Sequence, residues 1–178
     1  MRRRAEAGFT MIEMLVTIAL IGVLAAIAIP VFTDSKRKST NASEVNEFFA
    51  EFRVRQDQWA NENGSYLSTG ANETTTWPTA PSAAGQYIGG SLPASWLTLR
   101  VRPPVSGKVK CAYVVITGTN TPLTGTVGPK ATLMGFTAPL KNWYYVLARC
   151  NADNDSSIDA YFMTTSESTE IKSLDNDN

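Results

Sequence analysis

An uncharged run near the N-terminus constrains this chain more than any other feature. From Met14 to Phe32 the sequence holds 19 residues without a charged side chain, and a helix needs about 20 apolar residues to cross the hydrocarbon core of a bilayer. Arginines at positions 2 to 4 precede the run and basic residues at positions 36 to 38 follow it, so the flanking charges do not decide its orientation. The run predicts a single membrane-spanning helix.

One carboxylate lies at the beginning of this apolar helix. Glu13 directly precedes the uncharged run, and an acidic side chain is costly within a membrane. A secretory signal peptide is one alternative, because residues 26 to 28 imitate its small-x-small cleavage site, but a disposable segment gains nothing from the carboxylate. A Glu13 side chain that merely extends to the lipid headgroups is a second alternative.

The residues around Glu13 resemble a known processing signal. The letters GFTMIE at residues 8–13, followed by the apolar run and Pro30, are similar to the prepilin signature of type IV pilins and of the related pseudopilins of type II secretion. The resemblance covers residues 8–32 and departs from the commonest pattern only at Met11 and Met14, where leucine is usual. It implies cleavage between Gly8 and Phe9 by a membrane peptidase, followed by N-methylation of Phe9.

The same resemblance implies a partner for Glu13. Cleavage would leave a positive amine on Phe9 at the start of an apolar helix, and a buried charge needs a counter-charge. In the family, the glutamate of one subunit meets the N-terminal amine of its neighbour as helices bundle into a filament. We therefore expect Phe9 and Glu13 to be assembly residues. Pro30 is expected to kink the helix near Ala26 without ending it.

A second helical stretch follows the apolar run and has one apolar face. Val45, Phe48, Phe49 and Phe52 fall at i, i+3, i+4 and i+7, which is the spacing of an amphipathic helix. Asn63-Gly64 is typical of a helix end. The expected segments are a leader at 1–8, a transmembrane and assembly helix at 9–32, an amphipathic half-helix at 33–63, a variable loop at 64–95 and a sheet region with an acidic end at 96–178.

Four later stretches have the apolar, β-branched and aromatic residues typical of strands. They are residues 97–102, 109–117, 143–149 and 158–164. The third alternates poorly between apolar and polar residues, which favours a central strand covered on both faces. We expect an α+β architecture in which the second half of a long N-terminal helix packs on an antiparallel sheet of three to four strands, and this arrangement resembles the pilin fold.

The predicted arrangement of strands would allow the two cysteines, Cys111 and Cys150, to form a disulfide bond. If the second and third predicted strands form a hairpin, the start of one lies opposite the end of the other, within disulfide range. A bond closing a loop of about 40 residues would contribute about 3 to 4 kcal/mol in the chain-entropy account. Two free thiols are the alternative.

Oxygen-bearing side chains alternate directly after the second cysteine. In the stretch NADNDSSID, Asn151, Asp153, Asp155 and Asp159 are candidate ligands because calcium prefers hard oxygen donors. The turn glycine and the final glutamate of an EF-hand loop are absent, although some pseudopilins hold calcium near the C-terminus. A solvated acidic turn is the alternative to a calcium site, and we expect no other cofactor.

The composition excludes several classes of function. The chain has no histidine and two cysteines, which removes histidine acid–base catalysis and Cys/His zinc sites. The chain beyond the leader is mildly acidic and residues 64–95 contain no Lys or Arg, which disfavours DNA binding, although four lysines between positions 108 and 141 could still cluster. We expect a structural protein and not an enzyme.

The resemblance implies a structural subunit of a type IV pilus-like filament, as a major or minor pilin that supports adhesion, twitching motility or DNA uptake. A pseudopilin of a type II secretion system is the alternative within the family, and a DNA- or surface-binding pilin module is an alternative of another class. The implied partners are further copies of the chain, the prepilin peptidase and the pilus assembly platform. The implied location is the inner membrane before assembly, then an extracellular pilus or a periplasmic pseudopilus.

Overall fold

The structure is a computed structural model that describes residues 9–88, 91–102, 107–120, 123–151 and 160–174. The chain divides into two units between Lys36 and Arg37. A long helix, α1 (Met11–Asn63), begins in the first unit and ends in the second. Within the described ranges, every strand and both short helices belong to the second unit.

Helix α1 ends where the sequence predicts. Asn63 is its last residue, and Gly64 has a φ of 76°, which is the left-handed conformation that glycine adopts without steric cost. The Gly64 N–H donates to the Ala60 carbonyl at 2.8 Å, and the Asn63 side-chain amide donates to the Trp59 carbonyl at 3.0 Å. Two carbonyls of the last helical turn are thereby satisfied.

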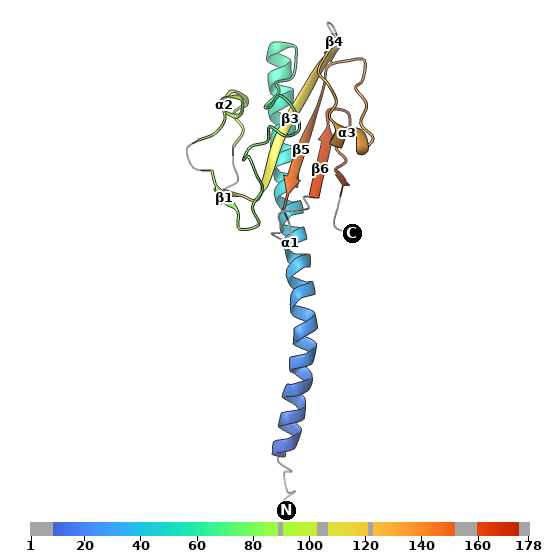
Figure 1. Cartoon of the computed structure of the whole chain (residues 1–178). Helices are drawn as coiled ribbons and strands as arrows, with labels where there is room; N and C mark the ends of the chain where they lie inside the picture. The colour runs from blue at the N-terminus through green and yellow to red at the C-terminus, as the bar shows by residue number, and fades with distance from the viewer. Residues whose placement is uncertain (1–8, 89–90, 103–106, 121–122, 152–159, 175–178) are drawn as a thin grey trace, which may run out of the picture. The chain divides into compact units, whose positions relative to one another are not determined.

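Five antiparallel strands form the main sheet, in the order β4-β3-β5-β6-β7, and Figure 1 shows β3, β5 and β6 side by side. This arrangement confirms the predicted α+β fold, and the sheet exceeds the expected three to four strands because the short strands β4 and β7 are added at its edges. A separate ladder pairs β1 with β2. The bounds are β1 Gln86–Tyr87, β2 Lys108–Val109, β3 Cys111–Asn120, β4 Leu123–Thr124, β5 Trp143–Cys150, β6 Ala160–Thr165 and β7 Lys172–Leu174.

The two central strands are covered on both faces, as the poor alternation of the third predicted strand indicated. Alternate residues of β3 and β5 enter two different clusters of buried side chains. One cluster contains the apolar stripe of α1, and the other lies under α3 (Pro129–Leu133) and the residues that follow it. Every residue of β5 except Arg149 is buried. The sheet is therefore the middle of three layers in this unit.

The core between α1 and the sheet is largely aromatic. Phe48 stacks on Tyr113 with ring centroids 4.4 Å apart, and Phe52 meets Trp96 edge to face at 4.9 Å. Trp77 meets the same Trp96 at 4.9 Å. Aromatic pairs in these geometries contribute about 0.5 to 1.5 kcal/mol each beyond their burial. The amphipathic half-helix and its predicted apolar face are confirmed.

The first predicted strand, residues 97–102, is wrong. The chain instead forms a short helix, α2 (Ala94–Leu99), which closes with Arg100 in the left-handed conformation at φ 55°. Trp96 and Leu99 are both buried, and their separation of three residues places them on one helical face. Burial of that pair against α1 decides the outcome, because local β-propensity is weaker than tertiary packing.

The other predicted strands are present with adjusted ends. The second is divided into β2 and β3, because Lys110 donates its N–H to the Glu44 carboxylate instead of continuing one strand. The third is β5, and the fourth corresponds to β6 over its described residues. The segment predicted as a loop, 64–95, contains β1 and the first residues of α2.

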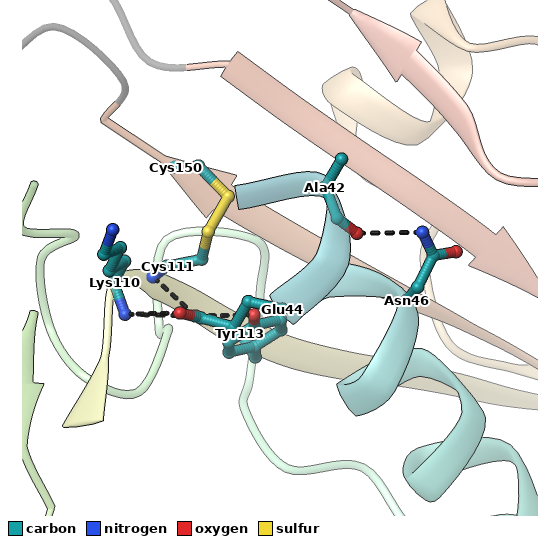
Figure 2. The surroundings of a disulfide bond; sticks show 7 residues. All are labelled: Ala42, Glu44, Asn46, Lys110, Cys111, Tyr113 and Cys150. Atoms are coloured by element: carbon teal, nitrogen blue, oxygen red, sulfur yellow. Dashed lines mark hydrogen bonds between the residues drawn. A yellow bond between two sulfur atoms is a disulfide. The ribbon is translucent and has the colours of Figure 1, made fainter. Parts of the chain in front are cut away.

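The predicted disulfide is present. Cys111 and Cys150 are directly opposed in the β3–β5 register with Cα atoms 4.3 Å apart, and their sulfurs are bonded. Figure 2 shows that the Glu44 carboxylate from α1 reaches the same corner, where it accepts N–H groups from Lys110 and Cys111 and the hydroxyl of Tyr113 at 2.9 to 3.0 Å. The beginning of β3 is thus joined both to β5 and to α1.

Replacing both cysteines by alanine should lower the free energy of unfolding of the second unit by about 3 to 4 kcal/mol, because the reduced chain regains the freedom of a 39-residue separation. Tryptophan fluorescence during urea unfolding measures this change, since all four tryptophans lie in that unit. Unchanged stability of the double variant would contradict the prediction.

Candidate assembly site on the N-terminal helix

The described part of the first unit contains an apolar helical stretch whose side chains find no cover within the unit. Met11–Ile29 is long and apolar enough to cross a membrane by length and composition, and none of its residues is buried. Phe9 is 79% exposed and Met11 is 90% exposed. Exposed apolar surface of this extent requires lipid or other helices as neighbours.

A reciprocal pair of side chains begins helix α1. Glu13 Oε2 accepts the Thr10 backbone N–H at 2.9 Å and the Thr10 hydroxyl at 2.8 Å. In return, Thr10 Oγ1 accepts the Glu13 backbone N–H at 3.4 Å. This is the capping box, in which a Thr at the N-cap and a Glu three residues later satisfy amide groups that the helix leaves unpaired.

The capping box changes how the charge of Glu13 is satisfied. The carboxylate lies in the first turn of α1, where the positive end of the helix dipole favours an anion. One oxygen is occupied by Thr10, while Oε1 has no hydrogen-bond partner among the residues that the structure describes. Glu13 can therefore be partly satisfied inside its own chain and still offer a second oxygen to an outside donor.

Thr10 is the residue that sequence reasoning missed. It stands within the GFTMIE letters, but no role was assigned to it. The signal was nevertheless available, because a Thr followed three residues later by Glu at the start of an apolar run is the sequence form of a capping box. The structure thus assigns Thr10 a capping role at the start of α1, next to the predicted assembly residues Phe9 and Glu13.

The structure describes only some of the other predicted site residues. Gly8, the expected cleavage position, lies outside the described residues. Helix α1 continues through Pro30, as expected for a proline that does not end it, and the kink stays a prediction. Of the candidate calcium ligands only Asn151 is described, since residues 152–159 are not, and calcium binding also stays a prediction. The described part of the chain contains no group of three acidic, Cys or His side chains that could hold a metal.

The four lysines that could have formed a basic patch are placed in different settings. Lys130 lies 4.3 Å from the centroid of the Tyr161 ring, and Lys141 pairs with Glu167 at 3.0 Å. The remaining two, Lys108 and Lys110, line a surface hollow of about 330 Å³ together with two glutamates of α1. Each of the four lysines therefore has an aromatic or acidic side chain nearby, and the absence of DNA binding stays a prediction.

Comparison with known proteins supports the resemblance found at the N-terminus. Residues 3–29 match the family described as the prokaryotic N-terminal methylation motif. The type II secretion system core protein G of Klebsiella michiganensis is 30% identical over 89 residues, which cover 49% of this chain and 62% of that protein. The type IV major alpha-pilin of Moraxella bovis is 51% identical over 41 residues, 22% of this chain and 26% of that protein.

A third relative extends further along the chain. The fimbrial protein EcpC of Eikenella corrodens is 28% identical over 128 residues, which cover 71% of this chain and 66% of that protein. The chain spans less than two thirds of the length of the Klebsiella and Moraxella relatives. No solved structure is significantly similar to it. The chain therefore carries a prepilin-type N-terminal motif and is similar to fimbrial proteins, type IV pilins and a secretion core protein.

Replacing Thr10 by valine should loosen the start of α1, because valine keeps the shape of threonine but offers Glu13 no hydroxyl and caps no amide. The backbone amide of Glu13, which the Thr10 hydroxyl accepts, should exchange with solvent several-fold faster in the detergent-solubilised full chain, measured by NMR. Thr10→Ser keeps the hydroxyl and serves as the control. Equal exchange in the valine and serine variants would show that the capping box does not stabilise this end.

Proposed function

We propose that this chain is a structural subunit of a pilus-like filament. Its N-terminal helix holds the subunit in a membrane before assembly, and the subunits polymerise through the same helix. The observation that carries the proposal is an apolar helix whose exposed side chains surround a single charge, Glu13, with one carboxylate oxygen uncommitted. The methylation motif at residues 3–29 and the similarity to pilins, fimbrial proteins and core protein G support it. The proposal assigns the chain a structural role and no enzymatic activity.

The proposed assembly step uses one charge from each of two subunits. Cleavage after Gly8 creates an amine on Phe9, which is methylated and stays positive. The amine then donates a hydrogen bond to the free Oε1 of Glu13 in a neighbouring subunit. Oε2 of that Glu13 continues to accept its two hydrogen bonds from Thr10. In an apolar surrounding such a charge-assisted pair is strong, and lateral packing of the exposed apolar side chains covers the rest of the helix.

Two kinds of filament fit this step, and each is favoured by one of the relatives. Similarity to the Moraxella and Eikenella proteins favours a pilus subunit, major or minor. Similarity to core protein G favours a subunit of a type II secretion filament. Shearing surface fibres from cells separates the two: a pilus subunit appears in the sheared fraction, whereas a secretion subunit stays with the cells and its loss stops export of secreted proteins.

Glu13→Ala should insert into the membrane and be cleaved normally but give a severely reduced yield of filaments, because the neighbour's amine would then be buried without a counter-charge. Electron microscopy and immunoblotting of sheared material measure the yield. Glu62→Ala, an exposed glutamate at the far end of α1, is the matched control and should assemble normally.

Two outcomes would contradict the proposal. Normal filament yield from Glu13→Ala would favour the side chain that only extends to the headgroups. A mature protein that begins at Ile29, found by N-terminal sequencing, would establish an ordinary signal peptide, whereas methylated Phe9 is the expected first residue.

A further inference from the structure

Strand β3 has one edge that no full strand covers. Cys111 and Cys150 are opposed with a Cα separation of 4.3 Å, which is the spacing of a non-hydrogen-bonded antiparallel pair. Because backbone groups alternate in direction along a strand, Cys111, Tyr113 and Val115 direct their N–H and C=O groups away from β5. On that outer side, β4 pairs only with Thr119 and Asn120.

The composition of β3 makes an open edge hazardous. Residues 111–117, CAYVVIT, contain no charge, proline or glycine and end in four β-branched residues. Short segments of this kind form intermolecular sheets readily when their backbone is exposed at an edge. An unpaired row of N–H and C=O groups is a template for another chain.

A loop of the same chain occupies the edge in place of a strand. We call residues 66–82 the strap. Trp77 and Tyr113 exchange two backbone hydrogen bonds, at 2.8 and 2.9 Å. Thr69 donates its N–H to the Val115 carbonyl at 3.0 Å, and its hydroxyl accepts the Val115 N–H at 2.8 Å. Cys111 donates its outward N–H to Glu44. The three outward N–H groups, of Cys111, Tyr113 and Val115, therefore each donate to a different kind of acceptor: a carboxylate, a backbone carbonyl and a hydroxyl.

A buried carboxylate in the middle of the strap binds the strap to α3, which lies on the other side of the sheet from α1. Glu73 is 8% exposed. Its two oxygens accept the N–H groups of Lys130 and Ala131, each at 2.9 Å, and the hydroxyl of Tyr145 at 3.2 Å. Burial raises the pKa of Tyr145, so the phenol keeps its proton and donates. An added Cβ at Gly128 would collide with this carboxylate, so the site is closely fitted around it.

We propose that the strap hides an interaction surface, the outer edge of β3, whose partner is the same edge of a second copy of this chain, and that Glu73 keeps the strap closed. When the strap opens, Tyr113 and Val115 regain free N–H and C=O groups. Two such edges related by a two-fold axis pair antiparallel with identical residues on both sides. The inference does not depend on the proposed filament role. In a filament, a closed strap would restrict contact between copies to other surfaces.

Amide hydrogen exchange of the detergent-solubilised full chain, resolved by residue with NMR, tests the proposal in the variant Glu73→Gln. Glutamine keeps the size of the side chain but presents an NH₂ group to donors that require an acceptor. The amides of Thr69, Trp77, Tyr113 and Val115 should exchange about tenfold faster, as expected for the loss of one buried hydrogen bond. The amides of Val114 and Ile116, which are directed toward β5, should keep their wild-type exchange rates.

The second readout concerns association. At high protein concentration the variant should form dimers or larger species in which Tyr113 and Val115 are protected again while Thr69 and Trp77 stay open. This pattern is the one expected when the β3 edges of two copies pair, because the β3 amides are then covered while the strap is not. Glu170→Gln, which changes an exposed glutamate, is the control and should leave both exchange and association unchanged.

A second variant covers the case in which Glu73→Gln destabilises the whole unit, which faster exchange at Val114 and Ile116 would reveal. Thr69→Val removes only the hydroxyl that caps the Val115 amide, and that amide alone should exchange faster. Wild-type rates at Val115 in Thr69→Val, or at Tyr113 in a folded Glu73→Gln, would overturn the strap as the cover. Oligomers in which Tyr113 and Val115 remain open would overturn the β3 edge as the hidden surface.

Discussion

The second unit depends on the burial of one helical stripe of α1 against the sheet. Val45, Phe48, Phe49 and Phe52 are at most 2% exposed. The ring of Phe48 contacts Tyr113 of β3, and the ring of Phe52 contacts Trp96 of α2. Full burial of such side chains contributes about 1.5 to 3 kcal/mol each, whereas a typical hydrogen bond between neutral groups contributes about 0.5 to 1.5 kcal/mol. Helix α2 and the strap both add to this aromatic layer, since Trp96 of α2 contacts Phe52 and also Trp77 of the strap.

Three glutamates perform related tasks around this framework. Glu13, Glu44 and Glu73 each accept at least one backbone N–H and one hydroxyl, from Thr10, Tyr113 and Tyr145 respectively. A carboxylate suits this task because its two oxygens can accept several donors, and hydrogen bonds to a charged acceptor are stronger than those to a neutral one. In Glu44 and Glu73 the bonds join a helix or a loop to segments far away in sequence, whereas in Glu13 they stay within one helical turn and leave an oxygen for another molecule.

Much of the fold could be predicted because its signals are local. The membrane-length run, the helical spacing of the phenylalanines and the Asn63-Gly64 end each require only a few neighbouring residues to be recognised. The Cys111–Cys150 bond followed from one further assumption, that two strands are adjacent and antiparallel, and the register confirms it. Residues 97–102 failed for the opposite reason: their apolar and β-branched content suits a strand, but Trp96 and Leu99 become helical because a pocket beside α1 can bury both from one face.

The sequence by itself determined the N-terminal helix, its single carboxylate with a capping threonine, and the motif that relates the chain to pilins, because each is a property of consecutive residues. The tertiary structure alone decided how β3 is protected and what holds its beginning. Glu44 lies 67 residues from Cys111, and Glu73 lies 58 residues from Ala131. No local pattern marks either glutamate as a partner of those amides, because the match exists only after packing has placed a buried N–H group in front of each carboxylate.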